Sequence, residues 1–315
     1  MPGPAIYMEH LRKVFGSRIA VADLTLQVER GEVFGFLGPN GAGKTTTVKM
    51  MTGLIRPTSG RISILGRPLG DMAARRRIGF LPEQFRFHEW LRADEFLDFH
   101  GALYGLTSDE RRRRIPEVLG LVGLEGRATS RLQTFSKGML QRIGIAQALI
   151  AEPELVFLDE PTSALDPIGR REVRGIIRQL QGQEVSIFLN SHLLTEVEQV
   201  CNRAAIIKDG VVVAMGPLDE LLGGTHVVEV RAEISPELLK AAVPRYNIVE
   251  ENPSRQPVAI DGNKGTLYLA SLADEEVPAL VDFLTQGGAR IYAIMPRQRS
   301  LEELFVDVVQ AGGDR

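Results

Sequence analysis

The sequence predicts an α/β protein in two parts, a larger domain of residues 1–222 and a small α+β domain of residues 226–315. A short apolar run at residues 33–37 passes through a glycine-rich turn into a helical pattern, and a second run at 155–159 ends in two carboxylates. Beyond Gly223-Gly224, strands and helices alternate on a smaller scale. A chain of 315 residues is also long for a single domain.

The composition is that of an ordinary globular protein, with 44% hydrophobic residues, 24% charged residues and a net charge of −3. This balance does not indicate a general nucleic-acid binder. Arginine runs at residues 75–77 and 111–114 lie in charge-mixed helical surroundings, which favours solvated helix faces over a phosphate-binding patch. The single cysteine, Cys201, can form no internal disulfide, which favours a reducing compartment, and its apolar neighbours predict a buried position.

The first part of the chain predicts a small antiparallel layer beside the core of the larger domain. Residues 6–29 form short β-like runs that break at Gly16-Ser17, and residues 61–65 form another strand. Phe15 stands just before this break, where we expect an exposed aromatic side chain. Taken alone, such a residue belongs more often to the core than to a ligand site.

The stretch Gly38-x-x-x-x-Gly43-Lys44-Thr45 predicts a phosphate-binding loop, because it lies between a strand and a helix. Backbone N–H groups and the helix N-terminus converge on phosphate oxygens in such a loop. We expect Lys44 on the β- and γ-phosphates and the Thr45 hydroxyl in the shell of a Mg²⁺ ion. The remaining loop residues expected to bind are Pro39, Asn40, Gly41, Ala42 and Thr46.

A helical insertion is expected at about residues 88–148. Its apolar residues fall on two stripes, one of Phe96, Leu97, Phe99 and Leu103 and one of Val118, Leu119, Leu121 and Val122. The insertion ends in Ser136 and Gly138, which precede an apolar helix. From their spacing alone these two residues indicate only a helix cap.

The uninterrupted apolar run at residues 155–159 predicts a strand buried on both faces, as in a parallel sheet. Ligands bind at the carboxyl ends of such strands. We expect Asp159 to hold Mg²⁺, directly or through water, and Glu160 to accept a proton from the attacking water. His192 follows a strand at residues 185–189, at the same sheet edge, which favours a contact with the γ-phosphate.

The remaining elements complete the two domains. Strands at 204–207 and 211–214 are joined by Asp209-Gly210, a hairpin turn signal. A two-layer α+β domain without a cluster of catalytic residue types is expected to follow. Its elements are a strand (227–234), a helix (236–243), two strands flanking 261–265, a helix (276–285), a strand (290–294) and a helix (301–309).

Together these stretches resemble the ATP-binding subunit of ABC transporters, most closely the ABC-2 type exporter ATPases that carry a small C-terminal domain. The resemblance covers nearly the whole chain and implies a P-loop NTPase fold of the ABC ATPase type, with a mixed sheet core. It implies these positions: Walker A at 38–45, the signature loop at 136–141, Walker B at 155–159 with Glu160 as catalytic glutamate, the D-loop at 163–166 ending in Asp166, the switch histidine at His192, and Phe15 stacked on adenine.

Two stretches depart from the family pattern. The signature reads Phe-Ser-Lys-Gly-Met instead of Leu-Ser-Gly-Gly-Gln, although Ser136 and Gly138 remain. Glu83 stands in the family's Q-loop glutamine position, with Gln84 next, and either residue could take that role. A carboxylate there could reach Mg²⁺ or its water, but it would repel the γ-phosphate.

The resemblance also implies ATP and Mg²⁺ as cofactors and a head-to-tail homodimer, in which Ser136 and Gly138 of one chain close over ATP held by Lys44 of the other. Hydrolysis would drive export through a separate integral membrane permease. The permease would dock near residues 85–91, where Trp90 and Phe87 are equally consistent with a docking surface and with buried packing.

No apolar run approaches the roughly 20 residues that span a bilayer. The expected location is therefore the cytoplasm, at the membrane face through the permease. The alternative is a soluble ABC ATPase that acts on ribosomes or DNA, but the sequence has neither a second nucleotide domain nor a long coiled-coil insertion. A third interpretation is a P-loop ATPase that acts only as a regulatory switch. Glu160 argues against it, because the carboxylate needed for hydrolysis is present. No nucleic-acid partner is expected.

Overall fold

The computed structural model describes residues 3–163, 165–222, 227–250, 266–272, 274–297 and 300–311. The chain divides into two compact units, one of Met1–Leu218 with Phe305–Arg315 and one of Asp219–Leu304. The domain limits at 222 and 226 remain a prediction. By packing, the second unit begins at Asp219. The expected break at Gly223-Gly224 and the turn at 261–265 lie outside the described residues.

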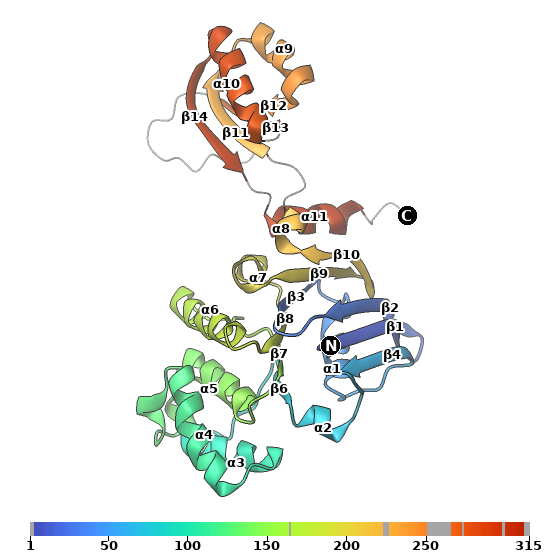
Figure 1. The fold of residues 1–315 in the computed structure, drawn as a ribbon, viewed down its shortest axis with the longest axis vertical. Helices are drawn as coiled ribbons and strands as arrows, with labels where there is room; N and C mark the ends of the chain where they lie inside the picture. The colour runs from blue at the N-terminus through green and yellow to red at the C-terminus, as the bar shows by residue number, and fades with distance from the viewer. Residues whose placement is uncertain are drawn as a thin grey trace. The chain divides into compact units, whose positions relative to one another are not determined.

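The first unit is built on a ten-stranded sheet of order β5-β4-β1-β2-β10-β9-β3-β8-β7-β6. β1, β2, β4 and β5 pair antiparallel, whereas β6, β7, β8, β3 and β9 pair parallel. The predicted mixed sheet with an antiparallel layer is therefore present (Figure 1). The strands are β1 (Ile6–Phe15), β2 (Arg18–Val28), β3 (Val33–Leu37), β4 (Ser59–Ile64), β5 (Arg67–Pro68), β6 (Ile78–Leu81), β7 (Leu155–Asp159), β8 (Ser186–Asn190), β9 (Arg203–Lys208) and β10 (Val211–Pro217).

Strands β3, β7 and β8 form the buried centre of this sheet, and every residue in each of them is buried. Their apolar runs contain no polar alternation because both faces of the sheet are covered. The ring of Phe188 packs against Phe34, Phe36 and Phe157, with centroids 5.9, 5.1 and 5.7 Å away. The prediction of a doubly buried strand at 155–159 is confirmed, and its carboxyl end lies beside the ends of β3 and β8.

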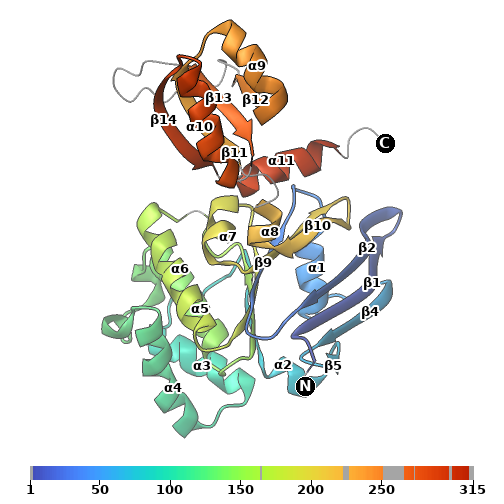
Figure 2. The same ribbon diagram turned by 45° about the horizontal axis from the view of Figure 1, so that its top comes forward.

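The helices of the first unit pack against different parts of the sheet. α1 contacts β2, β7 and β8, and so lies between the antiparallel layer and the parallel strands (Figure 1). α3, α4 and α5 form one group (Figure 2), in which α5 contacts β6, the strand at the end of the sheet. The helices are α1 (Lys44–Met51), α2 (Met72–Arg75), α3 (Ala93–Tyr104), α4 (Ser108–Leu121), α5 (Lys137–Leu149), α6 (Pro167–Gln181), α7 (Leu194–Val200) and α8 (Leu218–Leu222), with 3₁₀ turns at Glu125–Arg127 and Leu132–Thr134.

The predicted stripe on α3 is only half right. Phe96 and Leu97 are buried, but Phe99 is 44% exposed and Leu103 is 68% exposed. The helix turns its Gly101 side inward, where the Arg111 side chain of α4 leaves no room for a Cβ. Phe99 and Leu103 consequently lie on the exposed flank of α3.

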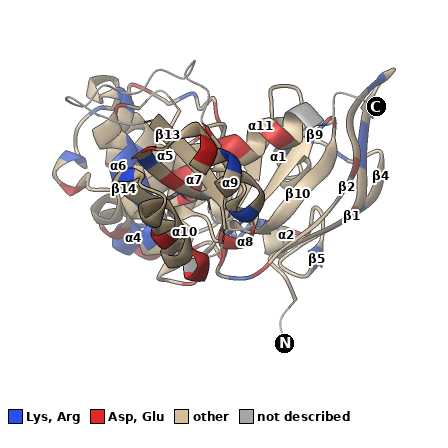
Figure 3. Ribbon diagram, turned by 90° about the horizontal axis from the view of Figure 1, so that it is seen from above, with Lys and Arg blue, Asp and Glu red and all other residues tan. Residues whose placement is uncertain are grey.

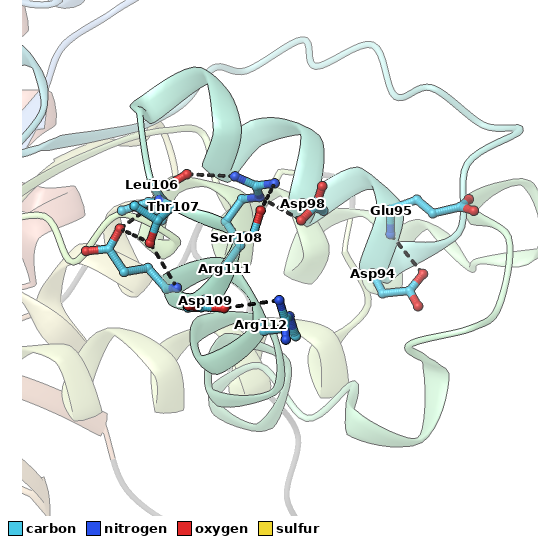
Figure 4. Close-up of polar contacts among 10 residues, drawn as sticks. Asp94, Glu95, Asp98, Leu106, Thr107, Ser108, Asp109, Arg111 and Arg112 are labelled. Carbon is cyan, nitrogen blue, oxygen red and sulfur yellow. Dashed lines mark hydrogen bonds and ion pairs between the residues drawn. The ribbon is translucent and has the colours of Figure 1, made fainter.

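The arginine run 111–114 is also only partly solvated. Arg111 donates to Asp98 Oδ1 and to the Leu106 carbonyl, each over 2.7 Å (Figure 4). Arg114 donates to the carbonyl oxygens of Leu149 and Ile150 at the end of α5. Residues three apart share a helix face, so these two arginines tie α4 to its neighbours while Arg112 and Arg113 remain exposed.

The second unit is the predicted two-layer α+β arrangement. Its antiparallel sheet has the order β12-β13-β11-β14, and its core contains Val230, Tyr268, Leu280 and Leu284. The elements are β11 (Val227–Glu233), α9 (Pro236–Tyr246), β12 (Ile248–Glu250), β13 (Thr266–Ser271), a 3₁₀ turn (Asp274–Glu276), α10 (Val277–Gln286) and β14 (Arg290–Arg297). The last helix, α11 (Leu301–Ala311), begins in this unit, and its residues from Phe305 onward belong to the first. In the part of the chain that the structure describes, no helix has the length and apolar character needed to cross a membrane.

Candidate nucleotide site

The glycine-rich loop connects β3 to α1 as the sequence predicts. A Cβ on Gly38 would collide with the Ile207 carbonyl oxygen, and Gly43 has a φ of 102°, which favours glycine. Gly43 is also the N-cap of α1, and no side chain caps the first turn. The first N–H groups of α1 are therefore available to an anion.

Lys44 is held inside this loop. Its Nζ donates to the carbonyl oxygens of Gly38 at 2.5 Å and Pro39 at 3.2 Å. Burial lowers the pKa of Lys44, and the nearby carboxylates of Glu160, Asp159 and Glu83 oppose that shift. The loop thus brings one buried ammonium group within electrostatic range of three acidic residues that are distant in sequence.

Phe15 lies at the rim of a hollow of about 340 Å³ that the loop also lines. The Phe15 side chain is 49% exposed, and the Lys13 ammonium lies 4.8 Å from its ring centroid. Lys13 Nζ is itself fixed by a 2.8 Å hydrogen bond to the Arg56 carbonyl. The ring of Phe15 thus contacts the Lys13 ammonium, lines the hollow and is half-exposed, so part of it is available to a ligand.

The two carboxylates at the end of β7 have different environments. Asp159 is 3% exposed and accepts a 2.5 Å hydrogen bond from Asn190 Nδ2. Burial raises the pKa of Asp159, while the hydrogen bond from Asn190 opposes the rise. Glu160 has a φ of 54°, its N–H donates to the Asn190 carbonyl over 2.8 Å, and its Oε2 lies 2.6 Å from His192 Nδ1.

Glu83 and Gln84 follow β6 and are both exposed. The Glu83 carboxylate raises the pKa of both Lys44 and Asp159. Glu83 therefore lies within electrostatic range of the phosphate loop and of the β7 carboxylates. Its position brings a fourth strand end, that of β6, to the same edge of the sheet.

Ser136, Gly138 and Asp166 lie at a second hollow, of about 360 Å³, which shares no lining residue with the first. Ser136 caps α5 by accepting the Met139 N–H over 3.3 Å. Asp166 caps α6 by accepting the Gly169 N–H over 2.8 Å. The predicted site residues thus form two separate groups within one chain. Position 164 of the expected D-loop lies outside the described residues.

Comparison with known proteins assigns the family. A family model described as ABC transporter matches residues 21–163. An uncharacterized ABC transporter ATP-binding protein of Synechocystis sp. is 42% identical over 302 residues, which make up 92% of this chain and 78% of the relative. The chain belongs to the ABC transporter family. This ABC protein is accordingly an ATPase, which binds and hydrolyses ATP, and the resemblance seen in its motifs is confirmed.

Two further comparisons extend over much of the ABC protein. Nod factor export ATP-binding protein I of Cupriavidus pinatubonensis is 34% identical, over 88% of this chain and 91% of the relative. A solved dimeric ATP-binding cassette, in a post-hydrolysis state with ADP and Pi, matches with a TM-score of 0.61 and 27% identity, over 68% of this chain and 98% of that one. The predicted fold class is confirmed.

Sequence reasoning missed Lys13 and Asn190. Lys13 meets Phe15 because residues two apart on β1 share a face. Asn190 pairs with Asp159 in the ladder between β8 and β7. The sequence holds a partial signal for the second pair, since each residue ends a buried strand, but the register that joins them is visible only in the fold.

Proposed function

We propose that this chain is the ATP-hydrolysing subunit of an exporter, and that two copies dimerise head to tail to drive a separate membrane permease. The separation of the two hollows carries this proposal. The phosphate loop lines the first hollow, with the carboxylates of Glu83, Asp159 and Glu160 within electrostatic range of its Lys44. Ser136, Gly138 and Asp166 line the second hollow. In two antiparallel copies, the phosphate-loop group of each chain would face the Ser136, Gly138 and Asp166 group of the other. The export relative among the comparisons supports the transport role.

The phosphate loop would hold the nucleotide through its backbone. N–H groups of the loop and of the first turn of α1 would bind phosphate oxygens, and Lys44 would exchange its two carbonyl partners for the β- and γ-phosphates. Adenine would stack on the exposed part of the Phe15 ring. The proposed nucleotide contacts are Phe15, Gly38, Pro39, Asn40, Gly41, Ala42, Gly43, Lys44, Thr45 and Thr46.

Oxygen ligands from Thr45, Asp159 and Glu83 fit a Mg²⁺ ion. Among the described residues, no three His, Cys, Asp or Glu side chains form a group that could hold a metal. Mg²⁺ suits such a site because it is usually bound by one or two carboxylates together with substrate phosphates and water. When bound, Mg²⁺ neutralises charge that develops on the phosphates.

Glu160 would act as the general base for the attacking water, and His192 would orient the Glu160 carboxylate. The 2.6 Å contact between His192 Nδ1 and Glu160 Oε2 supports this pairing. The backbone at Glu160 is left-handed and its N–H is held by the Asn190 carbonyl, so Glu160 does not continue the extended conformation of Asp159. One carboxylate would thus face the metal while its neighbour faces the water.

Ser136 and Gly138 would close over the γ-phosphate held by the partner chain. They stand at the start of α5, where the helix dipole favours an anion. Gly138 meets no atom closer than 4.0 Å at its Cβ position, so a phosphate can approach the backbone. Asp166, across the same hollow, would contribute to that closure.

The permease would dock at an aromatic patch that we define as Trp90, Phe99 and Leu103, which are 67%, 44% and 68% exposed. His88 connects Trp90 to Phe99, with ring centroids 5.3 and 5.6 Å away. Phe87 is partly buried against Phe85 and Phe96, so it belongs to the packing beneath the patch. Because Phe85 directly follows Gln84, movement at the nucleotide site would reach this surface.

The alternative of an ATPase acting on ribosomes or DNA has no structural observation in its favour. Lys and Arg residues are interspersed with Asp and Glu along the helices of the described chain (Figure 3). A nucleic-acid footprint would instead gather positive charge on one face.

Affinity capture tests the exporter proposal. The Glu160→Gln chain would be used with ATP to capture partners from solubilised membranes and, in parallel, from the soluble fraction. We expect stoichiometric recovery of a multi-span membrane protein, which is lost when Trp90→Ala is added. Lys240→Ala, in the second unit, serves as a matched surface control. Recovery of ribosomes or DNA without a membrane protein would contradict the proposal.

A further inference from the structure

Asn190 occupies the end of β8, next to Asp159 at the end of β7. We infer that Asn190 is a positioning residue, which fixes the Asp159 carboxylate in the orientation that binds a nucleotide-associated divalent cation. The inference rests on the proposed metal role of Asp159. Residues of this kind orient a ligand without touching the metal, and their loss commonly weakens metal binding.

The geometry of the pair is tight. Asp159 and Asn190 are direct partners in the parallel ladder, and their side chains are 3% and 2% exposed. The Asn190 Nδ2 donates to Asp159 Oδ1 over 2.5 Å. A buried carboxylate without a donor would be costly, and this amide supplies one that is locked to the strand.

The Asn190 side chain has no other hydrogen bond among the described residues, and its buried Oδ1 is without a partner there. An amide kept only for packing could be replaced by an apolar side chain of similar size on a strand that is otherwise apolar. The bond to Asp159 is therefore what the amide contributes. A carboxylate restrained through one oxygen has less freedom to lose when it takes up a ligand.

The backbone of Asn190, independently of its side chain, binds the neighbouring residue Glu160. Its carbonyl accepts the Glu160 N–H over 2.8 Å, and a side-chain substitution at residue 190 leaves that bond in place. Glu160 is also held by His192. Changing the Asn190 side chain should consequently act on Asp159 and the cation, and only weakly on the general base.

The test compares nucleotide affinity with and without Mg²⁺ for the wild type, Asn190→Leu and Asn190→Ser. Leucine has the same branched shape and the same number of non-hydrogen atoms but is bulkier and cannot donate, and serine is a smaller polar side chain that cannot reach Asp159. For both variants we expect the half-saturating Mg²⁺ concentration for ATP binding to rise about tenfold, the lower end of the usual loss for such residues. ATP affinity measured in EDTA should change by less than about twofold, because the phosphate loop is untouched.

Ser186→Ala is the matched control. Ser186 is buried at the opposite end of β8, where its Oγ accepts the Gly31 N–H over 2.9 Å. It should lower the melting temperature while leaving the Mg²⁺ dependence unchanged. An unaltered Mg²⁺ dependence in either folded Asn190 variant would overturn the inference. Absence of any Mg²⁺ dependence in the wild type would instead remove the proposed metal site itself.

Discussion

At the scale of single residues, the phosphate loop could be read from the sequence, whereas the partners of its neighbours could not. The loop is contiguous, and the backbone geometry at Gly38 and Gly43 restricts both positions to glycine. Lys13 contacts Phe15 on the same strand, but it is fixed there by the carbonyl of Arg56, 43 positions away. Asn190 acts across strands, so its contact with Asp159 depends on register and on which strands are neighbours. No local pattern specifies either.

Glu160→Gln should preserve ATP binding but slow hydrolysis by about 10²- to 10⁴-fold, the usual contribution of a general base. The amide keeps the shape of the side chain but accepts no proton. Turnover and nucleotide affinity would be measured on the same preparation. Glu154→Gln is the control, since Glu154 lies just before β7 and pairs with Arg30 at 2.8 Å, away from the site. Normal turnover in Glu160→Gln would remove Glu160 from the mechanism.

Lys13→Met should raise the KM for ATP about two- to fivefold, which corresponds to about 0.5–1 kcal/mol for an exposed cation–π contact. The kcat should stay the same, because Lys13 touches the Phe15 ring and no carboxylate of the site. Steady-state kinetics would separate the two constants. Lys13→Arg keeps the cation and should stay near the wild type. A fall in kcat with an unchanged KM would show that Lys13 does not act through Phe15.

At the scale of elements, strand positions followed from the sequence more closely than the orientation of the helices did. The strand at 155–159 begins with four consecutive apolar residues, which fit only an environment buried on both faces. The stripe on α3 allowed two orientations, and the close approach of α4 at Gly101 selected the one that exposes Phe99 and Leu103.

The packing of α3 also predicts a pH dependence. Burial lowers the pKa of His100 to about 4, from an ordinary value of 6.5, with a further contribution from His88. The unfolded chain therefore takes up a proton between these values that the folded chain does not. We expect the free energy of unfolding to decrease as the pH falls through this range, beyond the loss caused by other groups.

Denaturant unfolding at several pH values would measure this effect. His100→Phe should fit among Phe85, Phe96 and Phe99, whose rings lie 6.1, 4.5 and 5.4 Å from the imidazole. The variant should lose stability less steeply between pH 6.5 and 4, because its side chain takes up no proton. Equal slopes for the two proteins would show that His100 is not buried in its neutral form.

At the scale of the whole molecule, the sequence predicted two domains and assigned the last helix, at 301–309, to the second of them. α11 begins in the second unit, while its residues from Phe305 onward pack with the first, where the Val309 carbonyl accepts a 2.6 Å hydrogen bond from Lys208. That bond joins residues 101 positions apart, which periodicity within α11 cannot reveal.

The central claim is that a complete catalytic site needs two chains. Mixing inactive Lys44→Ala chains with inactive Ser136→Arg chains tests it most directly. In a head-to-tail dimer of one of each, the intact loop of one variant meets the intact Ser136 of the other, so one site is restored. With random pairing and independent sites, the mixture should recover roughly a quarter of wild-type ATPase activity. A mixture as inactive as its components would contradict the two-chain site.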